Sequence, residues 1–271
     1  MTDDAGRQLS LSAPAKRVVT TAPHLVEFLY AAGGGDVIVG VTAHSDYPDE
    51  ARTLPVIGDN RGVDMERLLA LKPDLLVLWK GGNPARLLAE WQRLGIPVFF
   101  SDVRRLEDIP DTLERLGTLV GRIEAAKRKA DALRREMNRL TRTYRHRTRL
   151  SVFYQVSENP MYTVNGKHLI SEALRLCGGD NIFAELPVIA PRVNLEAVLE
   201  KDPSVIFVSG RKEDGSDIRF WHAFGALTAV QRKQVYAINP DWVNRPGPRF
   251  VEGARELCRL LDLARTSSAA P

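Results

Sequence analysis

"VDMERLLALKPDLLVLW" (63–79) has a second copy, "VNLEAVLEKDPSVIFVS" (193–209), 130 residues further along the chain. Each copy starts with a good helix-capping residue, Asp64 or Asn194, continues with a short helical pattern and ends in an apolar run typical of a buried strand. The chain therefore consists of two related lobes. Two further pairs in the same order support this interpretation: 24–38 with 168–182, and "LPVI" at 54–57 and 186–189.

Short apolar runs alternate with helical patterns in both halves of the chain. Continuous apolar strands separated by helices predict a parallel sheet covered on both faces, so we expect an α/β fold with two Rossmann-like lobes. The expected strands are 17–20, 37–42, 74–79 and 97–101, then 150–156, 185–189, 204–209 and 234–238. The expected helices are 24–33, 85–95, 168–179, 220–230 and 249–265, and two more begin at Asp64 and Asn194.

A helical region separates the two halves. A helix is expected over 110–121, and the stretch 122–147 then contains neither Pro nor Gly. As a helix this stretch would be roughly 37 Å long, more than a small lobe needs, so we expect one long rigid helix joining the lobes and a ligand cleft between them. The predicted division is an N-terminal α/β lobe, a linking helical backbone and a C-terminal α/β lobe over 17–108, 109–148 and 149–265.

Composition excludes several classes of protein. The chain has 271 residues, 44% hydrophobic and 27% charged, and no apolar run long enough to span a membrane. Most of the excess positive charge lies between Arg122 and Arg149, in a helical stretch with few aromatic residues, which indicates a solvated helix face and no nucleic-acid partner. The polar start lacks the apolar core of a signal peptide and resembles the beginning of a mature secreted chain.

Sequence signatures of catalysis are absent. The chain has no Gly-x-Ser-x-Gly, no Walker loop, no Gly-x-Gly-x-x-Gly, no His-Glu-x-x-His and no Cys-x-x-Cys, and its histidines are not spaced as metal ligands. A binding protein explains this better than an enzyme does. The enzyme alternative, a glycosyltransferase-like or chelatase-like protein with two lobes, would need a cleft acid or base, for which the candidates are His44, Asp46 and Asp241.

Aromatic rings lie in stretches that follow the expected strands. We expect Tyr47 and Tyr162 to pack against their own lobes. Trp242 lies among prolines and a Gly-Pro, where a loop offers little core, so we expect its ring in the cleft. Flat rings in a cleft suit a large planar ligand.

The repeated glutamates, Glu66 and Glu196, allow two interpretations. Carboxylates in a first helical turn complement the helix dipole, and that could be their whole role. Alternatively, the duplication places one carboxylate on each lobe, and the pair would dock on a two-fold symmetric partner that carries arginines. The two cysteines, Cys177 and Cys258, are likewise compatible with a disulfide or with two buried thiols.

Four motifs give the chain a resemblance to a known family. "SDYP" (45–48), "MERLLALKPDLLVLWKGGN" (65–83), "CGGDNIF" (177–183) and "DWVNRPGPR" (241–249) resemble those of periplasmic substrate-binding proteins with a helical backbone, over roughly 17–262. Members of this class serve ABC importers of cobalamin, haem and ferric siderophores. The resemblance is closest to the cobalamin-binding members.

The resemblance implies a periplasmic, monomeric receptor without cofactor or catalytic residues that captures a corrinoid and delivers it to an ABC permease. It implies that Glu66 and Glu196 dock on arginines of the two permease subunits, and that Cys177 and Cys258 form a disulfide. The implied corrinoid contacts are His44, Trp79, Asp241, Trp242, Val243, Asn244 and Arg245.

Three positions depart from the pattern of a cobalamin-binding relative. His44 stands in place of a tyrosine, Asn60 in place of a tryptophan and Asn244 in place of a glutamate. Histidine is a competent axial ligand of haem iron, so a haem or ferric-siderophore receptor of the same class is the alternative. Cobalamin remains the preferred ligand. The protein needs no direct metal ligand for it, and the His44 imidazole could hydrogen-bond a corrin amide or act as an axial ligand of cobalt in place of water.

Overall fold

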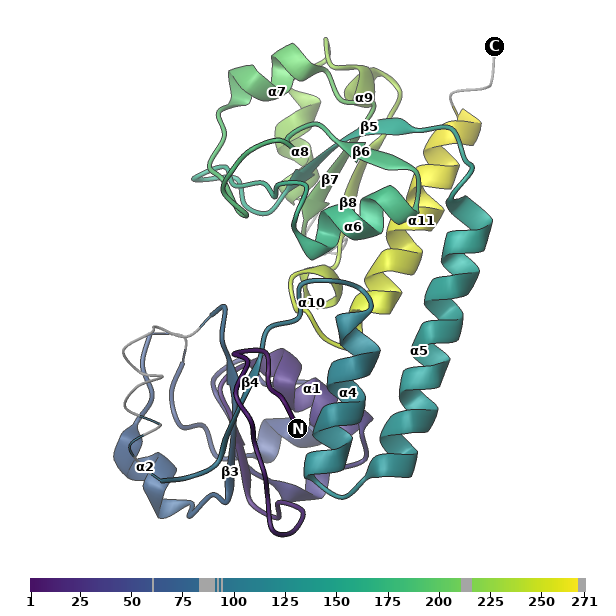
Figure 1. Cartoon of the computed structure of the whole chain (residues 1–271). Coiled ribbons are helices and arrows are strands. Elements are labelled where there is room, and N and C mark those ends of the chain that lie inside the picture. Colours follow the sequence, from purple (N-terminus) through teal and green to yellow (C-terminus); the bar gives the residue numbers. More distant parts are fainter. Residues whose placement is uncertain (60, 83–90, 92, 94, 211–215, 268–271) are drawn as a thin grey trace. The chain divides into compact units, whose positions relative to one another are not determined.

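The computed structural model describes the whole chain except residues 60, 83–90, 92, 94, 211–215 and 268–271. It contains two four-stranded sheets, ordered β2-β1-β3-β4 and β6-β5-β7-β8, in which all pairs of neighbouring strands are parallel (Figure 1). The chain divides into two compact units. Unit 1 comprises Met1–Val103 and Glu107–Arg134, and unit 2 comprises Arg104–Leu106 and Arg135–Pro271.

Unit 1 contains the first sheet. Buried side chains of β3 and β4 pack with Trp91, whose indole N–H donates to the Met65 sulfur at 3.3 Å. The strands β3 and β4 are mainly apolar, and all their side chains are buried except the partly exposed Trp79, as is typical of strands in a parallel sheet. The elements are β1 (Val18–Thr20), α1 (Pro23–Ala31), η1 (Gly35–Val37), β2 (Ile38–Gly40), η2 (Asp49–Thr53), α2 (Met65–Ala70), β3 (Leu75–Trp79), β4 (Val98–Ser101) and α4 (Asp108–Leu119).

Unit 2 repeats this plan. Its core forms around Phe153 and Trp221, whose rings meet edge to face at 5.6 Å between centroids. The elements are β5 (Leu150–Gln155), α6 (Leu169–Leu176), β6 (Gly179–Asn181), α7 (Leu195–Lys201), β7 (Val205–Ser209), α8 (Ser216–His222), α9 (Thr228–Gln231), β8 (Val235–Ile238), α10 (Pro240–Val243) and α11 (Phe250–Ser267).

The predicted internal repeat is confirmed by the order of the strands. In each sheet, the strand that comes first in the sequence lies between the second and the third, and the fourth lies beside the third. The duplicated sequence forms α2–β3 in one unit and α7–β7 in the other. The caps are equivalent as well: the Asp64 side chain accepts from the Arg67 N–H at 2.9 Å, and Asn194 accepts from the Ala197 N–H at 3.1 Å. The same local instructions therefore build the same helix-to-strand connection twice.

The long helix α5 (Ile123–Tyr144) has 22 residues and contains the boundary between the units, which falls after Arg134. Its later half belongs to unit 2 and is tied to α11 by Glu136, which accepts from Arg255 at 2.8 Å. The rigidity of α5, and the lobe limits 17–108, 109–148 and 149–265, stay predictions. Among the described residues, no helix is both long and apolar enough to cross a membrane.

Two elements differ from expectation. The strand predicted at 185–189 is wrong: this stretch is a turn with Val188 58% exposed, and Gly179–Asn181 takes the place beside β5. Glycine suits position 179 because a Cβ there would lie only 3.1 Å from side-chain atoms of Leu261 and Val152, closer than most side-chain contacts in proteins. The single helix predicted over 220–230 is split into α8 and α9. The helix predicted over 85–95 lies largely outside the described residues.

Candidate functional site

Trp79 ends β3 in unit 1 and is held by its neighbours on the sheet. Its backbone N–H donates to the Thr21 hydroxyl at 3.2 Å, and its ring meets the buried His24 ring edge on, at 5.1 Å between centroids. The following turn lies against the indole so closely that a Cβ on Gly82 would be 1.9 Å from it. Only glycine fits at that position while the ring stays where it is, so the turn and the ring form one small unit.

His44 follows β2 in a left-handed backbone conformation, with φ of 66°. Such a conformation is uncommon for a residue with a side chain, and the hydrogen bond from the Ala43 N–H to the Gly58 carbonyl, 2.8 Å, fixes the chain just before it. The imidazole is exposed and has no hydrogen-bond, ion-pair or ring partner among the described residues. The geometry therefore presents the imidazole outward from a defined backbone.

The α10 segment of unit 2 carries the other predicted contacts, Asp241 to Arg245. The Asn239 side chain caps α10 by accepting from the Asp241 N–H at 2.9 Å. One turn later, the Arg245 guanidinium pairs with the Asp241 carboxylate at 3.0 Å, and both side chains are largely buried, at 15% and 21% exposure. The short helix thus brings a cation and an anion together at one end of the unit 2 sheet.

Asn244 is anchored to that sheet. Its amide oxygen accepts from the Tyr154 hydroxyl at 3.1 Å, and its amide nitrogen lies 2.8 Å from the Ser209 hydroxyl. Burial raises the pKa of Tyr154, so the phenol keeps its proton and remains a donor. Sequence reasoning missed Tyr154 and Ser209. The one available signal for Ser209 was a polar residue at the end of an apolar strand.

Two other residues of the segment differ in exposure. Val243 is 1% exposed and packs on α11 at Gly253, where a Cβ would come within 2.6 Å of it. Its side chain therefore has a packing role, and any ligand contact there would use the backbone. Trp242 is half-buried, which leaves part of its ring accessible.

The expectation that Tyr47 and Tyr162 pack against their own lobes is wrong for both. Tyr47 is 46% exposed and Tyr162 is 38% exposed. The Tyr162 loop is held by its backbone: the Tyr162 N–H donates to the Ser157 carbonyl, and the Tyr162 carbonyl accepts from the Val156 N–H. Because the geometry of this loop comes from the main chain, the Tyr162 ring does not need to be buried.

The repeated glutamates, Glu66 and Glu196, lie in the first turns of α2 and α7, and both are exposed. The capping itself is done by Asp64 and Asn194, so neither glutamate is needed as a cap. Among the described residues, neither glutamate has a hydrogen-bond or ion-pair partner. Two carboxylates at equivalent positions are thus left accessible.

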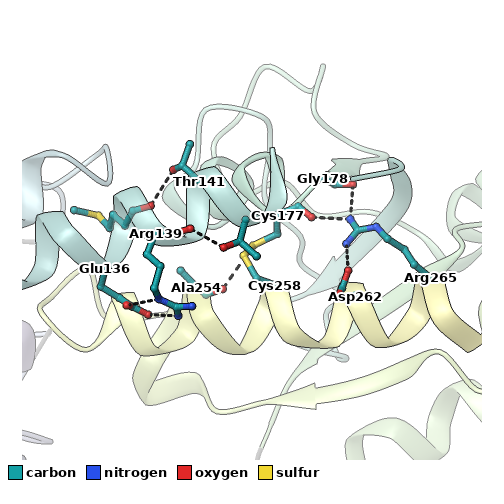
Figure 2. Close-up of a disulfide and its surroundings, with 11 residues drawn as sticks. Glu136, Arg139, Thr141, Cys177, Gly178, Ala254, Cys258, Asp262 and Arg265 are labelled. Atoms are coloured by element: carbon teal, nitrogen blue, oxygen red, sulfur yellow. Dashed lines mark hydrogen bonds and ion pairs between the residues drawn. A yellow bond between two sulfur atoms is a disulfide. The ribbon is translucent and has the colours of Figure 1, made fainter. Parts of the chain in front are cut away.

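The cysteines form the predicted disulfide. Cys177 is the C-terminal cap that directly follows α6, and Cys258 lies in α11; both are completely buried, and the bond joins residues 81 apart in the sequence. Figure 2 shows the bond beside Arg265, whose guanidinium donates to the carbonyls of Cys177 and Gly178. The end of α6 is therefore tied to α11 by one covalent bond and by hydrogen bonds. In the described part of the chain, no cluster of three or more His, Cys, Asp or Glu could hold a metal ion.

Known proteins match the chain over most of its length. The sequence model of the family described as "Periplasmic binding protein" matches residues 18–242. The chain is 40% identical over 253 residues to the Vitamin B12-binding protein of Vibrio cholerae serotype O1, covering 93% of this chain and 91% of that protein. It is 39% identical over 254 residues to the Vitamin B12-binding protein of Photorhabdus laumondii, covering 93% and 90%. The crystal structure of the periplasmic vitamin B12 binding protein BtuF of Vibrio cholerae matches with a TM-score of 0.87 and 39% identity, covering 93% of this chain and 98% of that one.

Proposed function

The chain belongs to the periplasmic binding protein family, and from this premise we propose that it is a periplasmic receptor that binds vitamin B12 and delivers it to an ABC importer. The observation that carries the proposal is the 40% identity to a Vitamin B12-binding protein across 93% of the chain. The protein acts by binding and not by catalysis. It works as a monomer, with cobalamin or a related corrinoid as its ligand.

The corrinoid contacts come from two groups of residues. In unit 1, the Trp79 ring supplies a flat apolar surface, and the exposed His44 imidazole supplies a nitrogen that can accept from a corrin amide or ligate cobalt. In unit 2, the accessible part of Trp242 supplies a second ring, and Asp241, Asn244 and Arg245 supply donors and acceptors for the amide side chains of a corrinoid. The assignment of the unit 2 residues is supported by the geometry of α10, which holds their side chains in place before the ligand binds and so lowers the entropy cost of binding.

A calorimetric titration with cyanocobalamin tests the ligand. We expect one-to-one binding at micromolar protein, and a Trp242→Ala variant that binds at least about tenfold more weakly because it loses aromatic contact area. Tyr162→Ala is a matched control, since Tyr162 is also a partly exposed aromatic residue of unit 2 but is not a proposed contact. Equal losses in the two variants would contradict the role of Trp242.

Haem is the second candidate, because the His44 imidazole is exposed and has no partner among the described residues. If cyanocobalamin gives no heat, haem is titrated next, and iron ligation by His44 predicts a Soret band that shifts in His44→Ala. A Soret band that is identical in the wild type and the variant would exclude His44 as the ligand.

Delivery uses Glu66 and Glu196, which dock on arginines of the two permease subunits through charge-assisted hydrogen bonds. Two observations support this docking role. Both glutamates are exposed at equivalent positions of the repeat, and other residues cap both helices. Glu66→Arg together with Glu196→Arg should weaken permease association about tenfold or more and leave cyanocobalamin affinity unchanged. Glu200→Arg, an exposed charge reversal on the same α7 helix, is the control. Equal loss of ligand and permease binding in the double variant would reduce the glutamates to a structural role.

A further inference from the structure

The first nine residues form a hairpin that lies outside the family match, which begins at residue 18. We call Met1–Leu9 the N-terminal hairpin. Thr2 and Gln8 pair in antiparallel fashion, and the Asp3 N–H donates to the Arg7 carbonyl at 3.0 Å. The Asp3 carboxylate is fully buried and accepts from the N–H groups of Ala5 and Arg7, both at 2.9 Å, and from the Arg7 guanidinium at 2.8 Å. So many hydrogen bonds to one buried carboxylate define a single conformation of the hairpin.

The N-terminal hairpin docks on β4, the last strand in the order of the unit 1 sheet. The Asp4 N–H donates to the Phe100 carbonyl at 3.0 Å, and the Phe100 N–H donates to the Asp3 carboxylate at 3.3 Å. The Arg7 guanidinium lies 3.9 Å above the centre of the Phe100 ring and donates to the Val98 carbonyl at 3.1 Å. These contacts satisfy backbone groups that an edge strand would otherwise leave open.

Asp4 also reaches the turns that follow β3 and β4. Its carboxylate accepts from the Asp102 N–H at 2.7 Å and from the Arg115 guanidinium at 2.7 Å, and its carbonyl accepts from the Lys80 ammonium at 3.1 Å. The two turns are joined to each other by the Lys80 N–H, which donates to the Ser101 carbonyl at 3.0 Å. Asp4 is therefore the point at which the hairpin, α4 and both turns meet.

The turn after β3 also lies against the Trp79 ring. A Cβ on Gly81 would lie 3.1 Å from the Asp102 carboxylate and 3.2 Å from the indole nitrogen of Trp79, and one on Gly82 would overlap the ring. The Trp79 ring thus rests on the turn after β3, in which Lys80 donates to the Asp4 carbonyl, and this turn lies against Asp102 of the turn after β4, whose N–H donates to the Asp4 carboxylate. We infer that Asp4 is a positioning residue, through which the N-terminal hairpin orders the Trp79–Gly82 turn for binding of the corrinoid.

This inference rests on the proposed function for its ligand, but the ordering of the turn can be measured without any ligand. Asp4→Ala removes the two acceptor contacts of the carboxylate, to the Asp102 N–H and to Arg115, and keeps the backbone carbonyl that accepts from Lys80. Asp36→Ala is the matched control, because it removes an Arg–Asp pair of the same unit, Arg122 to Asp36 at 2.8 Å, that does not involve β3 or β4. Asp4→Asn is the conservative variant, since an amide oxygen can still accept from the Asp102 N–H.

The experiment combines amide hydrogen exchange of the free protein with titration of cyanocobalamin. We expect Asp4→Ala to speed exchange at Lys80, Gly81 and Asp102 by about tenfold and to weaken cyanocobalamin binding about three- to tenfold, with part of both effects restored in Asp4→Asn and neither present in Asp36→Ala. Unchanged exchange at these amides overturns the inference. Faster exchange with unchanged affinity also overturns it, because the hairpin would then only cover the edge of the sheet. Wild-type protein that shows no binding refutes the proposed function instead, and the exchange data still decide whether Asp4 orders the turn.

Discussion

At the scale of single residues, Tyr154 shows how a buried group can organise an exposed one. Its hydroxyl is held in the unit 2 core by β5 and donates to the Asn244 amide, which also contacts Ser209. The amide is therefore fixed in one orientation before any ligand arrives. This matters for recognition, because a preoriented amide loses little entropy when it binds a polar group of the ligand.

Tyr154→Phe tests this arrangement. The variant removes one hydrogen bond and leaves the ring packed, so we expect a loss of about 1 kcal/mol in the free energy of unfolding and about a threefold weaker binding of cyanocobalamin. Urea unfolding and calorimetry measure the two quantities. Tyr236 lies on β8, the last strand in the order of the same sheet; Tyr236→Phe removes a hydroxyl that donates to Gln234, just before that strand, and should lower stability without lowering affinity. Equal effects of the two variants on affinity would contradict the role of Tyr154.

At the scale of elements, α6 has an unusual N-cap. The Nδ1 atom of His168 accepts from the Ile170 N–H at 3.1 Å, which requires an unprotonated imidazole. Burial lowers the pKa of His168 from 6.5 to about 4. A group whose pKa is lower in the folded state binds protons more readily when unfolded, so its contribution to stability is fully present above pH 6.5 and is lost as pH falls towards 4.

We therefore expect the free energy of unfolding to fall by about 2 kcal/mol between pH 6.5 and pH 4 because of His168. His168→Asn keeps a capping oxygen and has no titrating group, so the difference between the two proteins should appear in this pH range and nowhere above it. Denaturant unfolding at several pH values measures the difference. Parallel pH profiles of wild type and variant would show that the cap does not titrate.

The contact between α5 and α11 depends on Glu136. Its carboxylate accepts from Arg139 on its own helix at 2.7 Å and from Arg255 of α11 at 2.8 Å (the Arg139 pair is drawn in Figure 2). The hydrogen bonds from Arg139, and then those from Arg255, outweigh burial and lower the pKa of Glu136 to about 2. The pair therefore stabilises the folded state above about pH 4.3 and loses its contribution as pH falls towards 2.

Glu136→Gln should lower the free energy of unfolding by about 1 to 2 kcal/mol at pH 7 and much less at pH 2.5. Glu124→Gln is the control, because Glu124 is exposed near the start of the same helix, where no other described residue pairs with it. Thermal unfolding of both variants at the two pH values gives the comparison. A loss that does not depend on pH would mean that the pair contributes through packing alone.

At the scale of the whole molecule, one disulfide constrains unit 2. It closes a loop between Cys177 and Cys258, which are 81 residues apart, and both cysteines belong to the same unit. Closing so long a loop removes considerable entropy from the unfolded chain. The bond should therefore stabilise unit 2 more than unit 1.

Replacing both cysteines with alanine should cost about 4 kcal/mol in the stability of unit 2, and chemical reduction of the wild type should cost a similar amount. Urea unfolding followed by hydrogen exchange resolves the two units, and the amides of β5 and β7 should lose protection before those of β1 and β3. Alanine leaves no unsatisfied hydroxyl in the buried site, so the loss measures the cross-link and its small cavity. Equal destabilisation of both units would contradict a local role.

Sequence reasoning succeeded where a pattern is local and failed where it is not. The α2–β3 and α7–β7 connections were predictable because a capping residue, a helical period and an apolar run lie within one short stretch. The β6 strand was missed, because Gly-Asp-Asn has little intrinsic preference for a strand and pairs with β5 at a position where Leu261 and Val152 lie so close that only a residue without a Cβ fits easily. For the site, the motifs identified the α10 residues, but α10 itself is too short for a periodic pattern.

The amino-acid sequence was sufficient for two α/β lobes and for their duplication, because apolar periodicity and repeated capping residues are properties of neighbouring positions. The class of binding protein came from the resemblance of four short motifs to a known family. The anchors of the proposed site required the tertiary structure. Asn244 meets Tyr154 across 90 residues, and Asp4 meets Asp102 across 98. No pattern along the chain reports such pairs, since a hydrogen bond between distant residues forms only after the sheets have brought its two partners together.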